Sequence, residues 1–342
     1  MKIDEVISFL RSCQTPVTIM EVCGSHTASI LKNGIRQLVS PSIRLVSGPG
    51  CPVCVTTASY IDALIELALL KNHTVLSFGD MFKVKGSTLS LAEAKSRGAD
   101  ISLMLFPLEA IHLAQDNPQQ TFIIAAVGFE TSSPVYALLA DQIVQKGIKN
   151  IKLLTALKTM PSILELVCQT ESIDAFLCPG HVCAITGTKP FEHLACIHQK
   201  PFVVAGFEAE HILAALYEIV VQIKENRHTL TNLYRSVVRE APQPKANRLI
   251  NQYFESGSAY WRGIGEVENS GLYLRREYEF LDAGSKNLRA EDFPANCRCA
   301  DVIMGRISPQ ACPLFAKQCT PESAVGPCMV SAEGACGNAI NS

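Results

Sequence analysis

Eight short runs of apolar and β-branched residues recur along the first two thirds of the chain, separated by longer amphipathic segments. They are Val17–Val22, Ile43–Ser47, Thr74–Phe78, Ile101–Leu105, Phe122–Val127, Ile151–Thr155, Ile173–Leu177 and Phe202–Ala205. Continuous apolar runs that alternate with helical patterns are typical of βαβ units with parallel sheets covered on both faces. Eight such units can close as one barrel or divide into two open sheets, and we favour two α/β lobes.

The pattern changes after the eighth run. Residues 221–239 look helical, whereas from Asp292 onward periodicity is lost and cysteine, proline and glycine dominate. A loop-rich segment of that size needs something other than an apolar core to order it, and a metal centre would serve. We therefore expect a first lobe at residues 13–116, a second at 117–228, and a third domain at 229–342 that includes the N-terminal helix at residues 1–12.

Composition excludes several classes of protein. Of the 342 residues, 48% are apolar, which is enough for a sizeable core. The formal net charge of −2 without long charge runs argues against nucleic acid or an anionic membrane surface as a partner. No apolar run is long enough to span a bilayer, and the N-terminus is too short in its apolar part for a signal peptide. We expect a soluble, cytoplasmic protein.

Fourteen cysteines are many for such a chain. In a reducing compartment they do not indicate a disulfide framework, so metal ligation and thiol chemistry become the leading explanations. Five are scattered and are expected to be small buried hydrophobic residues: Cys13, Cys168, Cys178, Cys183 and Cys196.

Cys51 and Cys54 lie in the glycine-rich turn Ser47-Gly-Pro-Gly-Cys-Pro-Val-Cys54, between a strand end and a helix expected from about Thr56 to Lys71. Unpaired N–H groups at a helix start favour thiolate over thiol, which makes a Cys-x-x-Cys pair reactive. We predict redox or metal chemistry here. The alternatives are half of a zinc knuckle or two ordinary buried cysteines.

Polar residues follow several of the expected strands, and in parallel α/β sheets ligands bind outside the carboxyl ends of the strands. Cys23 and His26 follow the first run and can hold one metal ion, form a Cys–His nucleophile pair, or simply belong to a helix-capping turn. Glu130 follows the fifth run and His181 the seventh. These two residues are either functional or serve to satisfy loop backbone groups.

The remaining signal is a group of C-terminal cysteines: Cys297, Cys299, Cys312, Cys319, Cys328 and Cys336. Four thiolates in a loop-rich segment suit either structural zinc or an iron–sulfur cluster. Zinc sites usually contain paired Cys-x2–4-Cys knuckles, and this segment has none. The wider, irregular spacing favours a cluster.

Several longer motifs resemble the HypD family of hydrogenase maturation factors, in order over nearly the whole chain. They are Glu21-Val-Cys-Gly-Ser-His-Thr27, Gly48-Pro-Gly-Cys-Pro-Val-Cys54, Gly128-Phe-Glu-Thr131, Ala175-Phe-Leu-Cys-Pro-Gly-His-Val182, Val203-Val-Ala-Gly-Phe-Glu208, Trp261-Arg-Gly-Ile-Gly265, Cys312-Pro-Leu-Phe315 and Met329-Val-Ser-Ala-Glu-Gly-Ala-Cys336.

The resemblance implies two α/β lobes flanking a cleft, with a third region that holds a [4Fe–4S] cluster. It implies a scaffold on which the Fe(CN)2(CO) group of [NiFe] hydrogenases is assembled as transient cargo, together with the chaperone HypC. HypE, with HypF, would deliver cyanide. Such a protein is a redox-active assembly scaffold rather than a conventional turnover enzyme.

The resemblance also implies roles for individual residues. The family's cluster spacing, Cys-x12-Cys-x6-Cys-x16-Cys, selects Cys299, Cys312, Cys319 and Cys336 and leaves out Cys297 and Cys328. The other implied sites are iron-holding Cys23 and His26, the redox pair Cys51 and Cys54, and Glu130, Thr131 and His181, which would position the substrate or shuttle protons.

Two positions depart from the family pattern. Ala28 stands where the first motif commonly has a second histidine, so it cannot be a ligand, and Ser132 stands where a second threonine is common. Two rival functions remain. One is an iron–sulfur thiol oxidoreductase acting on a small molecule, and the other is a structural zinc protein whose other thiols are incidental.

Overall fold

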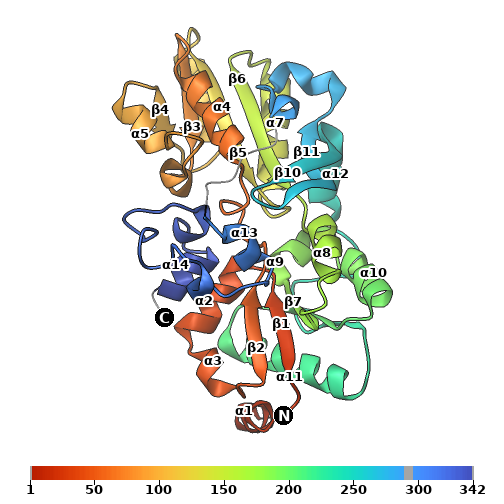
Figure 1. The fold of residues 1–342 in the computed structure, drawn as a ribbon. Coiled ribbons are helices and arrows are strands. Elements are labelled where there is room, and N and C mark those ends of the chain that lie inside the picture. The colour runs from red at the N-terminus through yellow and green to blue at the C-terminus, as the bar shows by residue number, and fades with distance from the viewer. Residues whose placement is uncertain (1, 289–295, 341–342) are drawn as a thin grey trace.

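The computed structural model describes residues 2–288 and 296–340, and two sheets organise it (Figure 1). The first sheet has five parallel strands in the order β2–β1–β7–β8–β9. These strands are β1 Val17–Glu21, β2 Ile43–Ser47, β7 Ala175–Pro179, β8 Phe202–Ala205 and β9 Leu230–Asn232.

Helices cover both faces of the first sheet because successive strand residues alternate between two apolar cores. Ile19 points into one core and Met20 into the other. The Ile19 side is covered by α1 Ile3–Arg11, α2 Gly24–Lys32, α3 Ile35–Leu38 and α11 Ala209–Lys224. The Met20 side is covered by α8 Met160–Cys168, α9 Gly180–Thr186 and α10 Lys189–His198.

The second sheet has six strands in the order β10–β11–β6–β5–β3–β4. Four are parallel: β3 His73–Ser77, β4 Ile101–Leu103, β5 Thr121–Gly128 and β6 Ile151–Lys158. An antiparallel hairpin, β10 Phe254–Trp261 and β11 Gly265–Leu274, is added at β6. One face packs on α4 Ala58–Ala68 and α5 Leu91–Ser96, and the other on α6 Glu109–Asp116, α7 Ser133–Lys146 and α12 Pro244–Tyr253.

The C-terminal region lies between the two sheets, where its short helices are seen in blue in Figure 1. They are α13 Cys299–Ile303, the 3-10 turns η4 Pro309–Ala311 and η5 Pro327–Met329, and α14 Ala335–Ile340. Three further 3-10 turns belong to the second lobe: η1 Gly79–Lys83, η2 Arg276–Leu281 and η3 Ser285–Asn287. None of the described helices is both long and apolar enough to cross a bilayer.

The expected α/β class with two mostly parallel sheets is confirmed. The sheets group the chain differently from the expected lobes at residues 13–116 and 117–228, however. The chain leaves the first sheet after β2, builds β3 to β6 in the second, returns for β7 to β9, and crosses again to add the hairpin of the expected third domain. The pairing of β1 with β7, with Ile19 opposite Ala175, is long-range, so no local sequence pattern predicts it.

One local expectation was also wrong, and one pair of strands was not foreseen. The helix expected over residues 221–239 ends at Lys224, where Asn226 adopts a left-handed conformation (φ 52°) and the chain turns into β9. The hairpin β10–β11 was not predicted as strands, because its glycines and serines weaken the β signal.

Candidate functional site

The turn that carries Cys23 and His26 follows the carboxyl end of β1 and begins α2. Cys23 is the N-cap residue of the helix and is partly exposed. Burial raises the pKa of its thiol, while the backbone N–H groups of Ser25 and His26 lower it. The free protein therefore holds this cysteine mainly as a thiol, with hydrogen-bond donors already placed to receive a thiolate.

His26 is fully buried, and its two ring nitrogens differ. Nε2 lies 3.1 Å from the Gly206 carbonyl oxygen, which can only accept, so the ring proton resides on Nε2. Nδ1 has no hydrogen-bond partner among the described residues and keeps its lone pair. Burial lowers the pKa of the ring to about 4, which keeps it neutral. A buried, neutral imidazole with one free lone pair has the chemistry of a metal ligand.

Three rings form a stack beside this turn. The His26 ring lies on Phe207 with 4.5 Å between ring centroids, and Phe207 lies on His181 at 3.9 Å. His181 is the second residue of α9 and is exposed. Thus the structure brings together His26 and His181, predicted from two different strand ends, with Phe207 between their rings.

Glu130 is buried at the end of β5 in the second sheet. Its Oε1 accepts a hydrogen bond from the Met160 N–H at 2.7 Å, and its Oε2 has no partner among the described residues. Burial raises its pKa to about 7. Burial raises the pKa of Cys183, and the charges of Glu130 in the second lobe and Cys23 in the first each raise it further. The neighbouring Thr131 is exposed.

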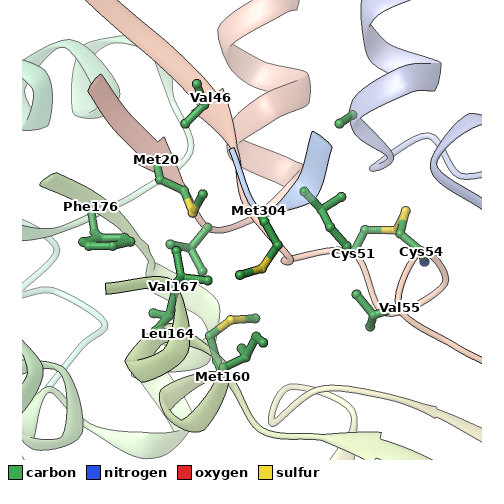
Figure 2. Close-up of a cluster of buried hydrophobic side chains, with 14 of the residues drawn as sticks. Met20, Val46, Cys51, Cys54, Val55, Met160, Leu164, Val167, Phe176 and Met304 are labelled. Carbon is green, nitrogen blue, oxygen red and sulfur yellow. Dashed lines mark hydrogen bonds between the residues drawn. A yellow bond between two sulfur atoms is a disulfide. The ribbon is translucent and has the colours of Figure 1, made fainter. Parts of the chain in front are cut away.

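Cys51 and Cys54 are buried and joined in a disulfide, on the crossing from β2 to α4. Figure 2 shows them at the edge of the apolar core that contains Met20, Met160 and Met304. A side chain at Gly50 would collide with the carbonyl of Val22 and the Cα atom of Cys23. The dithiol turn and the Cys23 turn are therefore in direct backbone contact.

The six C-terminal cysteines line one pocket. Two of them, Cys299 and Cys328, form a disulfide with each other. A sulfur in a disulfide cannot act as a thiolate ligand, so the expected set with Cys299 would require this disulfide to be reduced, and that set stays a prediction. The thiols of this group that stay free are Cys297, Cys312, Cys319 and Cys336.

These four thiols are close enough to affect one another. Burial raises the pKa of Cys336 to about 12, and the charges of Cys319, Cys312 and Cys297 add to the rise. No three His, Cys, Asp or Glu side chains in residues 2–288 and 296–340 are gathered as tightly as a bound metal ion would require. As a donor set, four thiols around a pocket in loop-rich structure fit a cluster or zinc.

The segment from Ser331 to Cys336 connects these parts, although the sequence predicts a role only for its last residue, Cys336. The Ser25 hydroxyl donates to Glu333 Oε1 at 3.0 Å, and Gly24 packs directly on the backbone of Glu333. The Ser331 hydroxyl donates to Asp80 Oδ2 at 3.1 Å, at the end of β3. The Glu333 carboxylate also raises the pKa of His181 against the lowering caused by burial. Glu333 lies within a motif quoted above, but only the fold places it beside Cys23.

Comparison with known proteins shows the family of the chain. The family model HypD, described as "Hydrogenase formation hypA family", matches residues 2–341. The chain belongs to the HypD family. It is 37% identical to the hydrogenase maturation factor HypD of Rhodobacter capsulatus over 335 residues, covering 95% of this chain and 89% of the relative.

Two other relatives show the same extent of similarity. The Escherichia coli hydrogenase maturation factor HypD is 37% identical, over 95% of this chain and 89% of the relative. A putative hydrogenase expression/formation protein of Methanocaldococcus jannaschii is 38% identical, over 93% and 90%. The resemblance inferred from the motifs is thereby confirmed, and the chain is a member of a family of hydrogenase maturation factors.

Replacing Gly50 tests the contact between the two turns. We expect Gly50→Ala to lower the free energy of unfolding by roughly 3 kcal/mol, because a β-carbon has no room against the Val22 backbone. Gly79→Ala is the matched control, since its β-carbon would lie 3.7 Å from Leu103 Cδ1, an ordinary contact. Urea unfolding measures both. Equal stability of the two variants would contradict the close approach.

The pKa of Glu130 predicts a pH dependence of stability. Between its unfolded value of 4.5 and its folded value of about 7, the folded protein binds more protons than the unfolded one. The contribution of Glu130 to the free energy of unfolding is fully present below pH 4.5. It falls by roughly 3 kcal/mol in total as the pH rises through 7. Glu130→Gln keeps an acceptor for Met160 and removes this loss.

The variant should therefore gain thermal stability relative to wild type as the pH is raised from 5 to 8. Glu210→Gln, an exposed position on α11, should show no such trend. A difference in stability between wild type and Glu130→Gln that stays constant across this pH range would contradict the raised pKa.

Proposed function

We propose that this protein is a scaffold for assembly of the Fe(CN)2(CO) group of [NiFe] hydrogenases, acting with a HypC-type chaperone. One observation supports this most directly. In a member of a hydrogenase maturation family, a Cys–His turn, a Cys-x-x-Cys turn and a four-thiol pocket converge between the two lobes. An ordinary thiol oxidoreductase would need the Cys-x-x-Cys turn and the four-thiol pocket but not the Cys–His turn.

Cys23 and His26 would hold the iron. A thiolate is a soft ligand that suits low-spin iron with strong-field diatomic ligands, and His26 Nδ1 offers a free lone pair. Further coordination positions would be filled by a cysteine of the chaperone and by the diatomic ligands. Because the pKa of Cys23 is raised, iron binding must displace its proton, and the Glu333 carboxylate, whose charge acts on Cys23, lies close enough to take part.

Cys297, Cys312, Cys319 and Cys336 would hold a [4Fe–4S] cluster, which supplies single electrons when bound. Reduction of the Cys51–Cys54 disulfide consumes two electrons and two protons and gives two thiols. Cys54 Sγ lies 3.8 Å from the carbonyl of Pro327, next in sequence to Cys328 of the second disulfide. This short path supports an exchange of electrons between the C-terminal pocket and the dithiol during ligand attachment.

The proposed partners follow from the same chemistry. HypE, with HypF, would donate cyanide, and the chaperone would share the iron. Among the residues of the site, His181 and Thr131 are exposed and can meet a partner or a substrate. Glu130, with its pKa near neutrality, is suited to move a proton in the interior.

Replacing Cys23 tests the iron site. Purified together with its chaperone, the Cys23→Ser variant should lose the infrared CN and CO stretches while it keeps the visible absorption of the cluster. Cys196→Ser, at an exposed cysteine on α10, should keep both. Retention of the diatomic bands in Cys23→Ser would remove this residue from the proposal. Thiol oxidoreductase turnover by the isolated chain, with no dependence on a chaperone, would favour the rival function.

The choice between Cys297 and Cys299 as the fourth ligand is tested by comparing neighbouring cysteines. Anaerobically purified Cys297→Ser should lose most of its iron and its charge-transfer absorption, because one of four ligands is missing. The double variant Cys299→Ser/Cys328→Ser should keep the cluster, at a cost of about 2–5 kcal/mol of stability for the lost disulfide. Loss of the cluster in the double variant, with retention in Cys297→Ser, would favour the ligand set that contains Cys299. Bound zinc without a visible absorption band would indicate a structural zinc site instead of a cluster.

A further inference from the structure

The motif Trp261-Arg-Gly-Ile-Gly265 has no role in the site described so far, yet it carries a buried charge. Trp261 ends β10, and Arg262 follows it in the turn of the hairpin. The Arg262 side chain is only 2% exposed. Guanidinium groups are rarely buried so completely, because removing the charge from water is costly unless the surroundings compensate.

Arg262 is attached to the segment that follows Cys54. Its N–H donates to the Val55 carbonyl at 3.0 Å, and its Nη1 donates to the carbonyls of Thr56 at 3.4 Å and Lys85 at 3.0 Å. The Thr56 hydroxyl in turn donates to the Pro52 carbonyl at 2.8 Å, inside the dithiol turn. One arginine therefore links the hairpin of the second sheet to both residues that follow the redox pair.

The position of this arginine is fixed by its neighbour. Trp261 packs against Phe129 with 5.9 Å between ring centroids, and its Nε1 donates to the Ser270 hydroxyl at 2.8 Å. Trp261 belongs to the same buried core as Cys51 and Cys54. The guanidinium also acts on the C-terminal pocket, where its charge lowers the pKa of Cys297 against the rise caused by burial.

We propose that Arg262 is a positioning residue that holds the Cys51–Cys54 turn and, through its positive charge, favours the reduced dithiol over the disulfide. Reduction creates sulfur groups that can become negative, whereas the disulfide is neutral. A fixed cation therefore stabilises the reduced state, and stabilising that state makes a Cys-x-x-Cys pair a stronger oxidant. The inference rests on the proposed redox role of the pair.

The equilibrium between the disulfide and dithiothreitol tests this on the full chain. In that exchange dithiothreitol loses two electrons and two protons to form its cyclic disulfide, and Cys51 and Cys54 gain them as two thiols. Alkylation followed by mass measurement of the peptide that contains both cysteines gives the reduced fraction. This readout involves no hydrogenase, so it stays valid even if the scaffold function fails.

Three variants separate charge from structure. Arg262→Gln should lower the equilibrium constant for reduction at least tenfold, a shift of about 30 mV for a two-electron couple. Arg262→Lys keeps the charge and should stay within threefold of wild type. Arg275→Gln is the matched control, because Arg275 also donates to a backbone carbonyl, that of Asn251, but lies at the far end of the hairpin. It should leave the equilibrium unchanged.

Two outcomes would overturn the proposal. The first is a folded Arg262→Gln protein whose equilibrium constant for reduction equals that of wild type. The second is an Arg262→Lys protein whose equilibrium constant falls tenfold, as far as that of Arg262→Gln. Should Arg262→Gln fail to fold, the lysine variant decides alone. A value within threefold of wild type supports the role of the charge, and a tenfold loss refutes it.

Discussion

The arrangement of this protein depends on one close approach, that of Gly50 to the backbone of Val22 and Cys23. Only a residue without a side chain allows the turn after β2 to lie on the turn after β1. Two chemically different sites are thereby brought into contact: a Cys–His pair with a free imidazole lone pair, and a buried Cys-x-x-Cys pair. Since the dithiol turn is also the crossing from the first lobe to the second, the same contact fixes how the chain leaves the first sheet.

The C-terminal region completes this centre by touching both lobes. Ser331 bonds to Asp80 at the end of β3, Glu333 accepts from Ser25 in the Cys23 turn, and Pro327 meets Cys54. All these contacts lie at the carboxyl ends of strands, where parallel sheets leave room for ligands. A loop-rich segment with little regular structure is thus ordered by contacts with both lobes. Glu333 is joined to Cys336 by a short stretch of chain, so a metal bound in the thiol pocket would affect the position of Glu333.

Much of this site could be predicted from the sequence, because strand ends are a local property. The placement of Cys23, Glu130 and His181 after apolar runs identified them, and the glycine-rich turn identified Cys51 and Cys54. The distribution of strands between sheets could not be predicted in this way, since the pairing of β1 with β7 joins segments that are far apart along the chain. Which cysteines lie next to each other is likewise a long-range property that spacing does not specify. Spacing along the chain selected Cys299, whereas the fold places that sulfur against Cys328 and leaves Cys297 free. Glu333 and Arg262 acquire their significance only from what they contact.

Burial gives the centre a common electrostatic character. It raises the pKa values of Cys23, Cys336 and Glu130 and lowers that of His26, so each of these groups is driven toward its neutral form. In the structure without metal, the thiols of Cys23 and Cys336 and the His26 ring therefore carry little charge at neutral pH, in contrast to the permanent cation of Arg262. A metal bound as proposed would have to displace thiol protons in a region of low polarity, at a cost in binding free energy. His26 incurs no such cost, because its Nδ1 is already unprotonated. The proposed iron site, with one thiol and one preformed neutral imidazole, would release a single proton, and the carboxylate of Glu333 beside Ser25 lies close enough to receive it.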